Sequence, residues 1–329
     1  MKVLSIGSDR NLFLPDSDVA RRQVKHAEKL SEFHIVVFAK KTLGFSAMKI
    51  GENVWVHPTN SFSRWLYPLD AFFLSKRFGG FDLVTAQDPF ESGLAAWLAS
   101  WNFNASLELQ IHTDLLSPYF IRESWLNLVR VGLAKFLLPR ADRVRVVSQR
   151  IADSLATAGL RLKTAPEVRP IAIDKEKIKD QPIAVDLKVK YPQFEKIILM
   201  ASRLSREKNI NLAIEAMSQV VKIRPNIGLI IVGSGPEEVF LKRQINRLQL
   251  ENNIFFEPWL KREQIISYAK TGDLFLVTSW YEGYGLTLVE AQAAGCKIVS
   301  TDVGVAKELG AIITPYDATK LSRIILDQI

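Results

Sequence analysis

The chain has 329 residues, of which 48% are hydrophobic and 24% are charged, and it carries a net charge of +8 at pH 7. These values are typical of a globular protein and exclude collagen-like, low-complexity and disulfide-rich classes, since the single cysteine, Cys296, cannot form an intramolecular disulfide. The length is too great for one typical hydrophobic core and predicts two domains of about 150 residues each.

The first half alternates short β-rich runs with longer segments of helical period, which is the pattern of βαβ units in a parallel sheet. The apolar run at the N-terminus is too short for a signal peptide, and no stretch reaches the roughly 18 apolar residues that span a bilayer. We therefore expect a cytoplasmic protein. The predicted strands are Lys2–Ile6, His34–Phe38, Val54–His57, Asp82–Thr85, Leu107–His112 and Arg143–Val147, and the predicted helices include Asp18–Leu30, Phe90–Ser100 and residues 124–138.

Residues 163–190 lack the alternating strand and helix pattern of the first half, because prolines and the charged run DKEKIKD (174–180) interrupt any periodicity. This stretch indicates a connector between a first domain, 1–172, and a second domain, 173–329. The second half then gives five strands alternating with helices, as in a Rossmann-like domain. The predicted strands are Lys196–Ala201, Gly228–Val232, Asn253–Phe256, Leu274–Thr278 and Lys297–Ser300, and the predicted helices are Ile210–Ile223, Glu237–Gln249, Glu263–Lys270 and Leu286–Ala294.

Residues 62–77 (FSRWLYPLDAFFLSKR) mix aromatic side chains with Arg64, Lys76 and Arg77. Such a mixture is typical of a segment that lies in a membrane interface, although Pro68 interrupts it and aromatic residues also build cores. Most of the excess positive charge lies in the first half, where it can attract phosphates or anionic lipid or simply form a solvated surface. A peripheral location on the inner face of the membrane therefore remains an open alternative.

The stretch 279–295 leaves a predicted strand, turns through Gly283 and Gly285, and enters a short helix. Glycines let the backbone come close to a ligand. The first amides of the helix, around Leu286 and Thr287, have no partner within the helix and lie at the positive end of its dipole. This turn therefore predicts a phosphate site.

Two carboxylates flank the predicted phosphate site. Glu282 precedes it, and Glu290 lies one helical turn inside the helix. A bound diphosphate would repel both side chains unless they face hydroxyl groups instead. The pattern favours a ligand that carries both phosphate and sugar; the plainer alternative is that Glu282 supports the loop and Glu290 is solvated.

Basic residues follow the first strand of the second half. Arg203 and Lys208 stand five positions apart in a loop beyond a strand's carboxyl end, where a planar guanidinium and a point charge can clamp a diphosphate. Arg206, between them, is expected to point into solvent. Open α/β sheets bind ligands beyond the carboxyl ends of their strands, so two such domains predict a cleft between them.

Two further strand ends contribute residues to this edge. Gly233 and Gly235 belong to the turn Val-Gly-Ser-Gly-Pro, which we interpret as a tight turn lining the cleft, because acidic residues in the helix that follows argue against phosphate there. Pro258 and Trp259 end the next strand. Trp259 is placed to flank a flat base, or else to pack between domains.

Residues 197–309 resemble the C-terminal domain of the family 4 glycosyltransferases of GT-B fold. The resemblance rests on "SRL…EKN", "IVGSGPE", "Glu-Gly-x-Gly-Leu…Glu-Ala…Gly" and "STDVG", which follow one another in that order. The first half is similar more loosely, through "AQDPFESGLAAWL" and "QIHTDLLSPYF". The resemblance implies an α/β protein of GT-B fold, with two Rossmann-like domains whose parallel sheets face one another across a cleft.

The same resemblance implies an activity, namely transfer of a hexose from a nucleoside-diphosphate sugar to an acceptor hydroxyl with retention of anomeric configuration. The first domain would face the acceptor and the second would hold the donor. The implied catalytic residues are His112, Arg203, Lys208 and Glu282. The implied donor-binding residues are Gly7, Gly233, Gly235, Pro258, Trp259, Gly283, Tyr284, Gly285, Leu286, Thr287 and Glu290, with Glu290 on the ribose hydroxyls.

Members of this family usually need no divalent metal and no other cofactor, and the sequence offers no acidic metal cluster. The catalytic load would then be electrostatic stabilisation of the departing diphosphate by the two cations and the helix amides. Two departures from the family pattern stand out. The loop after the first strand has one glycine, Gly7, with Asp16 and Asp18 nearby, and only 19 residues follow Gly310, so we expect altered contacts there and weaker domain closure.

Two other functions compete with this interpretation. One is a nucleotide-sugar epimerase or hydrolase on the same fold. The other is a non-catalytic basic module that binds RNA, but no RNA-binding motif supports it and we expect no nucleic-acid partner. The sequence leaves the base, the sugar and the acceptor open, with lipid, glycan and protein acceptors all compatible.

Overall fold

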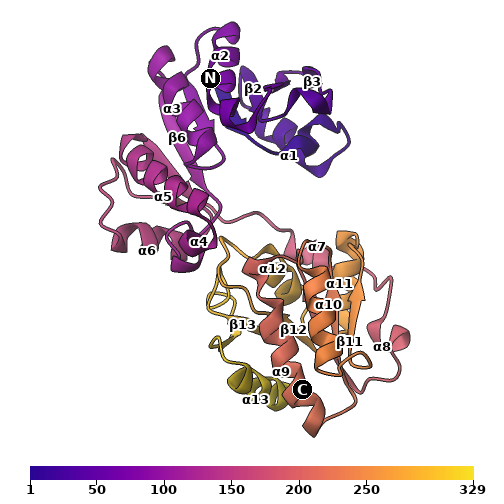
Figure 1. Cartoon of the computed structure of the whole chain (residues 1–329). Helices are drawn as coiled ribbons and strands as arrows, with labels where there is room; N and C mark the ends of the chain where they lie inside the picture. Colours follow the sequence, from indigo (N-terminus) through magenta and orange to yellow (C-terminus); the bar gives the residue numbers. More distant parts are fainter. The chain divides into compact units, whose positions relative to one another are not determined.

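The computed structural model describes residues 1–329, which form two compact units, Met1–Arg169 and Pro170–Ile329 (Figure 1). Each unit is an α/β structure built on its own sheet. No helix in either unit is both long enough and apolar enough to cross a membrane.

The first unit has an eight-stranded sheet in the order β3-β4-β2-β1-β5-β6-β7-β8. Every neighbouring pair is parallel except β3 and β4, which are antiparallel. The order reverses direction between β1 and β5, as in a Rossmann sheet. The strands are β1 (Lys2–Gly7), β2 (Glu32–Val37), β3 (Met48–Gly51), β4 (Val54–Pro58), β5 (Leu83–Ala86), β6 (Ser106–Ile111), β7 (Arg143–Val146) and β8 (Glu167–Val168).

Two helices of the first unit begin at serine side chains that cap their free amides. Ser17 accepts a hydrogen bond from the Ala20 amide at the start of α1, and Ser124 does the same for Asn127 in α5. Helix α1 packs on an apolar cluster formed by β1, β2 and β4. Helices α2 and α3 pack against each other. The helices are α1 (Asp18–Ala27), α2 (Tyr67–Ser75), α3 (Glu91–Phe103), α4 (Pro118–Glu123), α5 (Trp125–Leu137) and α6 (Gln149–Thr157).

The second unit has a fully parallel six-stranded sheet in the order β11-β10-β9-β12-β13-β14. Its direction of growth reverses between β9 and β12, so the loops that follow these two strands diverge and leave a crevice. The strands are β9 (Lys196–Ala201), β10 (Ile227–Val232), β11 (Ile254–Glu257), β12 (Leu274–Val277), β13 (Ile298–Thr301) and β14 (Ile312–Thr314).

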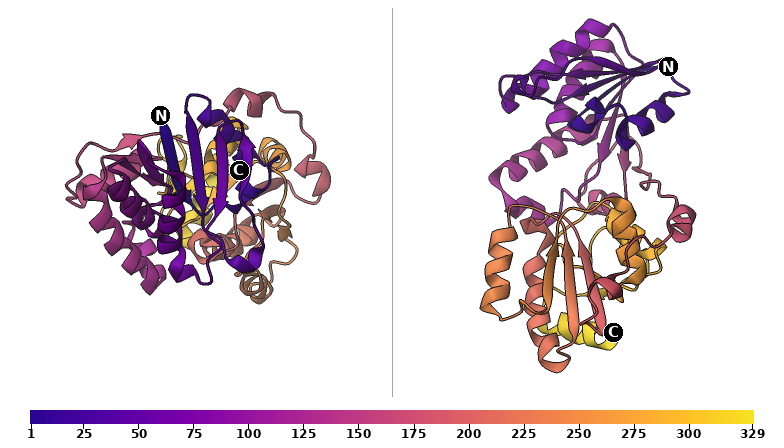
Figure 2. Two further views of the ribbon diagram at one scale, coloured as in Figure 1. Left: turned by 90° about the horizontal axis from the view of Figure 1, so that it is seen from above. Right: turned by 90° about the vertical axis from the view of Figure 1, so that its right-hand side faces the viewer.

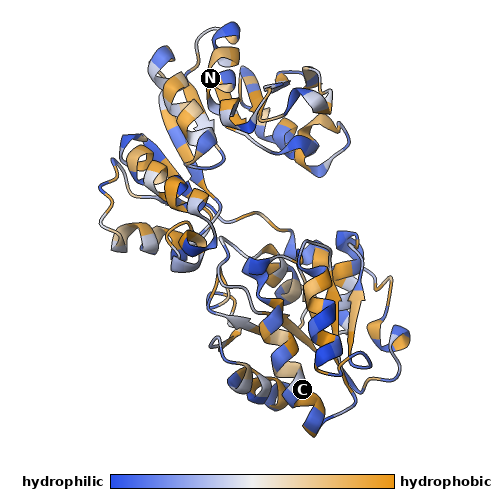
Figure 3. Cartoon of the chain, in the orientation of Figure 1, coloured by the Kyte–Doolittle hydropathy of each residue, from blue (hydrophilic) through white to orange (hydrophobic).

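Helices cover both faces of this second sheet (Figure 2). One buried cluster joins the strands to α9, α10 and α13, and another joins them to α8, α11 and α12. Figure 3 shows hydrophobic residues alternating with hydrophilic ones along α9 and α10, in keeping with helices that bury one face. The helices are α7 (Lys175–Asp180), α8 (Leu187–Lys190), α9 (Ile210–Ile223), α10 (Glu238–Arg247), α11 (Arg262–Thr271), α12 (Leu286–Ala293) and α13 (Ala318–Gln328).

Three expectations from the sequence are wrong in detail. The second unit has six strands rather than five, because the short β14 carries too few residues to show a period. The charged run after Asp174 is not irregular; it forms α7, whose first turn Asp174 caps by accepting a hydrogen bond from the Lys177 amide. Pro68 does not interrupt its segment but lies in the first turn of α2, where a missing N–H breaks no hydrogen bond.

Candidate functional site

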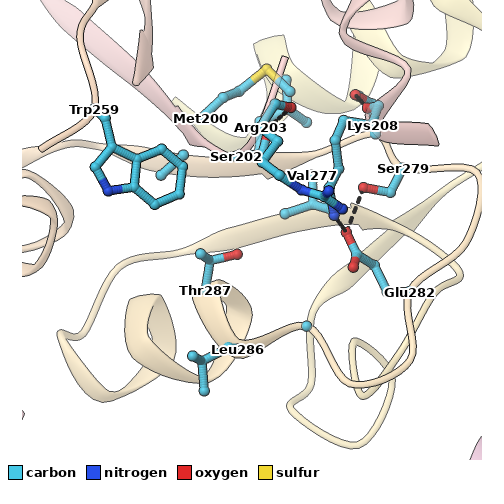
Figure 4. A pocket seen from close by; sticks show the side chains of 14 residues that line it. Met200, Ser202, Arg203, Lys208, Trp259, Val277, Ser279, Glu282, Leu286 and Thr287 are labelled. Carbon is cyan, nitrogen blue, oxygen red and sulfur yellow. Dashed lines mark hydrogen bonds and ion pairs between the residues drawn. The ribbon is translucent and has the colours of Figure 1, made fainter. Parts of the chain in front are cut away.

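A cavity of about 220 Å³ lies in the second unit where β9 and β12 end. This is the point at which the strand order reverses, so the position follows from the topology of the sheet. Residues from the loops after both strands, from the start of α12 and from the end of β11 line it (Figure 4). They are Met200, Ala201, Ser202, Arg203, Lys208, Trp259, Leu276, Val277, Thr278, Ser279, Glu282, Gly285, Leu286 and Thr287.

A half-buried ion pair lies on one wall of the cavity. The Nζ of Lys208 is 2.6 Å from Oε1 of Glu282, and the hydroxyl of Ser279 donates to the same oxygen at 2.8 Å (Figure 4). Lys208 comes from the loop after β9, and Glu282 comes from the loop after β12. The pair therefore joins the two loops and holds a cation and a carboxylate beside the same space.

Backbone hydrogen bonds fix these two loops against each other. The hydroxyl of Thr278 donates to the carbonyl of Lys208 at 3.0 Å, and the amide of Trp280 donates to the carbonyl of Glu207 at 2.8 Å. These bonds set the place of the Lys208 backbone independently of its side chain. The ammonium group can therefore move from Glu282 to a ligand without a change in the loop.

The Arg203 guanidinium is held at one terminal nitrogen and is otherwise exposed. One of its terminal nitrogens lies 3.0 Å from the buried carboxylate of Glu207, to which Ser205 also donates a hydrogen bond. The Arg203 side chain is nonetheless 68% exposed, so most of its donors face solvent at the cavity. A planar guanidinium in this state is suited to an anion with several oxygens.

The start of α12 supplies backbone donors. Gly285 adopts a φ of +88°, in the left-handed region, and so turns the chain directly into the helix. The amides of Leu286 and Thr287 donate no hydrogen bond within the protein, and both residues line the cavity. Together with the helix dipole, these amides form an anion site opposite the two cations.

Glu290 lies outside the cavity lining and is buried, where it pairs with Nε of Arg262 at the start of α11. The resemblance implied a role for Glu290 on ribose hydroxyls, and nothing in the sequence pointed to Arg262 as its partner. A buried carboxylate is stable when paired, and Arg262 supplies the compensating charge here. Arg262 is half exposed and can thus change partner when a ligand arrives.

Gly233 and Gly235 lie behind the cavity rather than in its wall. A Cβ atom on Gly233 would come within 1.9 Å of the Ser202 carbonyl oxygen, and one on Gly235 within 2.3 Å of the Leu204 carbonyl oxygen. Both glycines thus allow the turn after β10 to pack against the backbone that carries Arg203. These two glycines therefore affect the site by setting the position of the loop that carries Arg203.

Of the residues predicted for the donor site, the structure brings seven together in the cavity. They are Arg203, Lys208, Trp259, Glu282, Gly285, Leu286 and Thr287. Trp259 stands 64% exposed at the rim (Figure 4). Pro258, Gly283 and Tyr284 do not line the cavity, and the Tyr284 hydroxyl donates to the carbonyl of Ile171.

Two predicted residues belong to the first unit. Gly7 ends β1 and allows the side chain of Gln87 to lie against the backbone, since a Cβ atom would come within 2.1 Å of the Gln87 Oε1 atom. His112 follows β6, and its Nε2 atom is 3.2 Å from Oε1 of Gln110. Desolvation of the ring, with the nearby charge of Arg145, lowers the pKa of His112 and favours the neutral imidazole.

Sequence reasoning missed three side chains that organise the site: Ser279, Glu207 and Arg262. Ser279 lies at the start of the loop after β12 and could have been found as a polar residue at a strand's carboxyl end. Glu207 and Arg262 gave no such indication, because charged residues in loops and first turns are ordinarily solvated.

Comparison with known proteins agrees with this geometry. Residues 187–327 match the sequence family of the group 1 glycosyl transferases, and residues 20–167 match the glycosyl transferase 4-like domain. The chain belongs to the group 1 glycosyltransferases of family 4, and its two Rossmann-like units are those of the GT-B fold. The matched families favour glycosyl transfer over the epimerase, hydrolase and RNA-binding alternatives.

Several characterised proteins are similar to the chain. The alpha-monoglucosyldiacylglycerol synthase of Streptococcus pneumoniae is 28% identical over 237 residues, which are 67% of this chain and 51% of the relative. The N-acetyl-alpha-D-glucosaminyl L-malate synthase of Bacillus anthracis is 23% identical over 84% of this chain and 73% of its own. Anabaena HepE, solved with UDP and glucose, superposes with a TM-score of 0.74 at 25% identity, covering 99% of this chain and 89% of that one.

The alignment with the first of these relatives spans about half of the relative's length. The similarity therefore establishes the family and the fold.

Proposed function

We propose that this protein transfers a hexose from a nucleoside-diphosphate sugar to an acceptor hydroxyl with retention of anomeric configuration. The observation that carries the proposal is the convergence of Arg203, Lys208 and the free amides of α12 on one cavity. Two cations facing a helix N-terminus match the charge and shape of a diphosphate. The complex of Anabaena HepE with UDP-glucose favours a uridine nucleotide and glucose as the first donor to try.

Arrival of the diphosphate would change the partners of the cavity side chains. Lys208 would leave Glu282 for a phosphate oxygen, and the freed carboxylate would accept hydrogen bonds from the hydroxyls of the sugar. The exposed ring of Trp259 would lie against the base at the rim. In the same way Arg262 would give up part of its contact with Glu290 to let that carboxylate meet the ribose.

In the transfer step the bond between the anomeric carbon and the diphosphate oxygen breaks. The bond between the anomeric carbon and the acceptor oxygen forms on the same face, and the acceptor proton passes to the departing diphosphate. No side-chain base is then required. The protein lowers the barrier by stabilising negative charge on the leaving group through Arg203, Lys208 and the α12 amides.

The same argument leads us to propose that transfer is independent of divalent metal. Two cations and a helix N-terminus supply the positive charge that a metal ion would otherwise bring to the diphosphate. Transfer is expected to proceed at an unchanged rate in excess EDTA. A loss of activity restored by Mg²⁺ or Mn²⁺ would contradict this part of the proposal.

The donor assignment is tested first by thermal shift with UDP, ADP, GDP and their glucose conjugates. A ligand at 100 times its Kd should stabilise the fold by about 2.7 kcal/mol. The Arg203→Ala/Lys208→Ala double variant should lose this response, whereas the surface variant Lys242→Ala, whose side chain pairs with Glu238, should keep it. Absence of any nucleotide response in the wild-type protein would overturn the proposal.

We propose further that the acceptor is a lipid and that segment 62–77 meets an anionic membrane surface on the cytoplasmic side. Phe62 is 81% exposed, and Trp65 and Phe73 are exposed as well. Lys41 lies over the ring of Phe62 and Arg64 lies over that of Trp65, so cations accompany the apolar surface. The similarity to a glycolipid synthase supports a lipid acceptor.

Flotation with vesicles of phosphatidylglycerol and phosphatidylcholine tests this surface. The wild-type protein should float at low salt, and Trp65→Ser/Phe73→Ser should remain in the bulk. The matched control is Phe240→Ser, which removes an exposed aromatic residue from the second unit. Equal flotation of all three proteins would rule out the segment as the membrane contact.

A further inference from the structure

A chain of hydrogen bonds in the first unit ends at His112. The His112 Nε2 atom lies 3.2 Å from Oε1 of Gln110, whose amide nitrogen donates to the hydroxyl of Thr85 at 2.9 Å. Thr85 in turn donates to Oε1 of Glu108 at 3.0 Å. Glu108 and Gln110 occupy alternate positions of β6 and share one face of the sheet, and His112 follows directly after the strand. Thr85 on β5 lies beside Glu108 in register.

The direction of every bond in this chain follows from its last member. Oε1 of Glu108, in a residue only 8% exposed and near the charge of Arg145, accepts a hydrogen bond from the Thr85 hydroxyl. Thr85 must therefore give its single proton to Glu108, which leaves its oxygen to accept from the Gln110 amide. The Gln110 nitrogen also lies 3.4 Å from the Glu108 carboxylate.

These bonds fix the orientation of the Gln110 amide. Rotating it by half a turn would place its oxygen against the Glu108 carboxylate and against a hydroxyl that has no proton left to give. With the nitrogen on that side, the oxygen of Gln110 faces His112, and it can only accept. The imidazole must then carry its proton on Nε2.

The opposite ring nitrogen remains available. Nδ1 of His112 has no hydrogen-bond partner in the protein, and the side chain is exposed at the end of β6. With the proton held on Nε2 in the neutral ring, Nδ1 presents a lone pair.

We propose that Gln110 is a positioning residue that holds His112 in the Nε2-protonated form, so that Nδ1 accepts a hydrogen bond from a hydroxyl of the bound substrate. This role rests on the proposed glycosyl transfer, because it assigns His112 a hydroxyl partner. It separates a hydroxyl-bearing ligand from an anionic one, since a lone pair repels a carboxylate or phosphate. Thr85 and Glu108 act only through Gln110.

The test is long-range ¹H–¹⁵N NMR of the protein labelled at histidine, which distinguishes the two neutral forms of the ring. The chain has four histidines, so the His112 resonances are identified by their loss in His112→Ala. Wild type should show Nδ1 unprotonated. Gln110→Leu should lose this preference, whereas Gln149→Leu on α6 should leave it unchanged.

UDP release from UDP-glucose gives the second readout. Gln110→Leu should lower kcat about fivefold, as expected for one neutral hydrogen bond, and should have no further effect in His112→Ala. An unchanged ring form in Gln110→Leu, or additive losses in the double variant, would overturn the inference. The NMR result does not depend on turnover, so a wild-type protein that shows the expected ring form but never binds UDP-glucose would defeat the proposed function alone.

Discussion

The two sheets of this protein differ in the kind of residue that they place on their faces. In the second unit all six residues of β10 are buried, because helices cover both faces and every side chain must be apolar. In the first unit β6 and β7 alternate instead, and Glu108, Gln110, Arg143 and Arg145 share one face. A strand of a parallel sheet that is covered on both faces is ordinarily a continuous apolar run, so the alternation marks a polar region on one face of the first sheet.

The difference shows where each unit can carry chemistry. The strands of the second unit are apolar, so its polar groups lie in the loops beyond the strand ends. Lys208, Glu282 and the α12 amides meet there. In the first unit the strand itself carries a polar network that leads to His112. All four histidines also lie in the first unit.

The largest expected effect concerns the loops of the second unit. Lys208→Ala removes one cation from the leaving group and leaves the half-buried Glu282 unpaired. We expect kcat/KM to fall about 10²–10³-fold, far beyond the fivefold loss expected at Gln110. Initial rates of UDP release from UDP-glucose measure this, with Lys242→Ala as control. A loss below tenfold would mean that the loops do not dominate the chemistry.

The next prediction contrasts the strands themselves. Ile231→Ala on β10 opens a cavity in a fully buried site and should reduce the free energy of unfolding by about 2–5 kcal/mol. Arg143→Ala on β7 alters an exposed position and should change it by less than about 0.5 kcal/mol. Urea unfolding measures both. Similar losses for the two variants would contradict the contrast between the sheets.

Acid should weaken the first unit before the second. Burial, with the neighbouring His34, lowers the pKa of His57 to about 4, and burial also lowers the pKa of His34. Above pH 6.5 these rings are neutral in both the folded and the unfolded chain. Between pH 6.5 and 4 the unfolded chain binds protons at these histidines, whereas the folded unit does not. The free energy of unfolding therefore decreases as the pH is lowered, by about 1–3 kcal/mol for His57 when its partial exposure is allowed for.

Hydrogen exchange resolved by peptide can follow this loss in each unit separately. His57→Gln should flatten most of the pH dependence in the first unit, with His34 and His112, whose pKa values are also lowered, supplying the remainder. His26→Gln, which changes an exposed histidine, serves as the matched control. Equal acid sensitivity in the peptides of both units would show that histidine burial is not the cause.

The smallest effect is a gain. Gly132 lies inside α5 with nothing within 4 Å of a Cβ atom, so Gly132→Ala should raise stability by about 0.5–1 kcal/mol through helix propensity. Gly233→Ala should do the opposite in the second unit, because its Cβ atom would meet the Ser202 carbonyl oxygen. Thermal melts compare the two variants. A loss at Gly132 would indicate an unseen contact on α5.

Much of the fold could be predicted because apolar periodicity is a local property. The helix Ile210–Ile223 and the strand Lys196–Ala201 agree with the structure residue for residue. β3, β8 and β14 were missed. All three are short strands at the edges of their sheets, and each depends on the single strand that pairs with it. Helix α7 was missed because its stability comes from a capping aspartate and one buried isoleucine.

The candidate site was predictable where a motif places residues next to one another at a strand end. Gly285, Leu286 and Thr287 are consecutive, and their free amides follow from the glycine turn into a helix. The partners of the charged residues were not predictable. Glu207 pairs with Arg203 within one loop, where no period predicts the contact. Arg262 pairs with Glu290, which lies 28 positions away in the sequence.

By itself the sequence determined the two-unit α/β organisation, the family and the loops that carry its chemistry, since periodicity and motifs are encoded over short distances. Only the tertiary structure decided which charges neutralise one another and how His112 is protonated. Those outcomes depend on the strand order and register that bring Lys208 to Glu282 and Thr85 to Glu108. Electrostatic and hydrogen-bond energies fall off steeply with distance, so they are set only once the chain has folded.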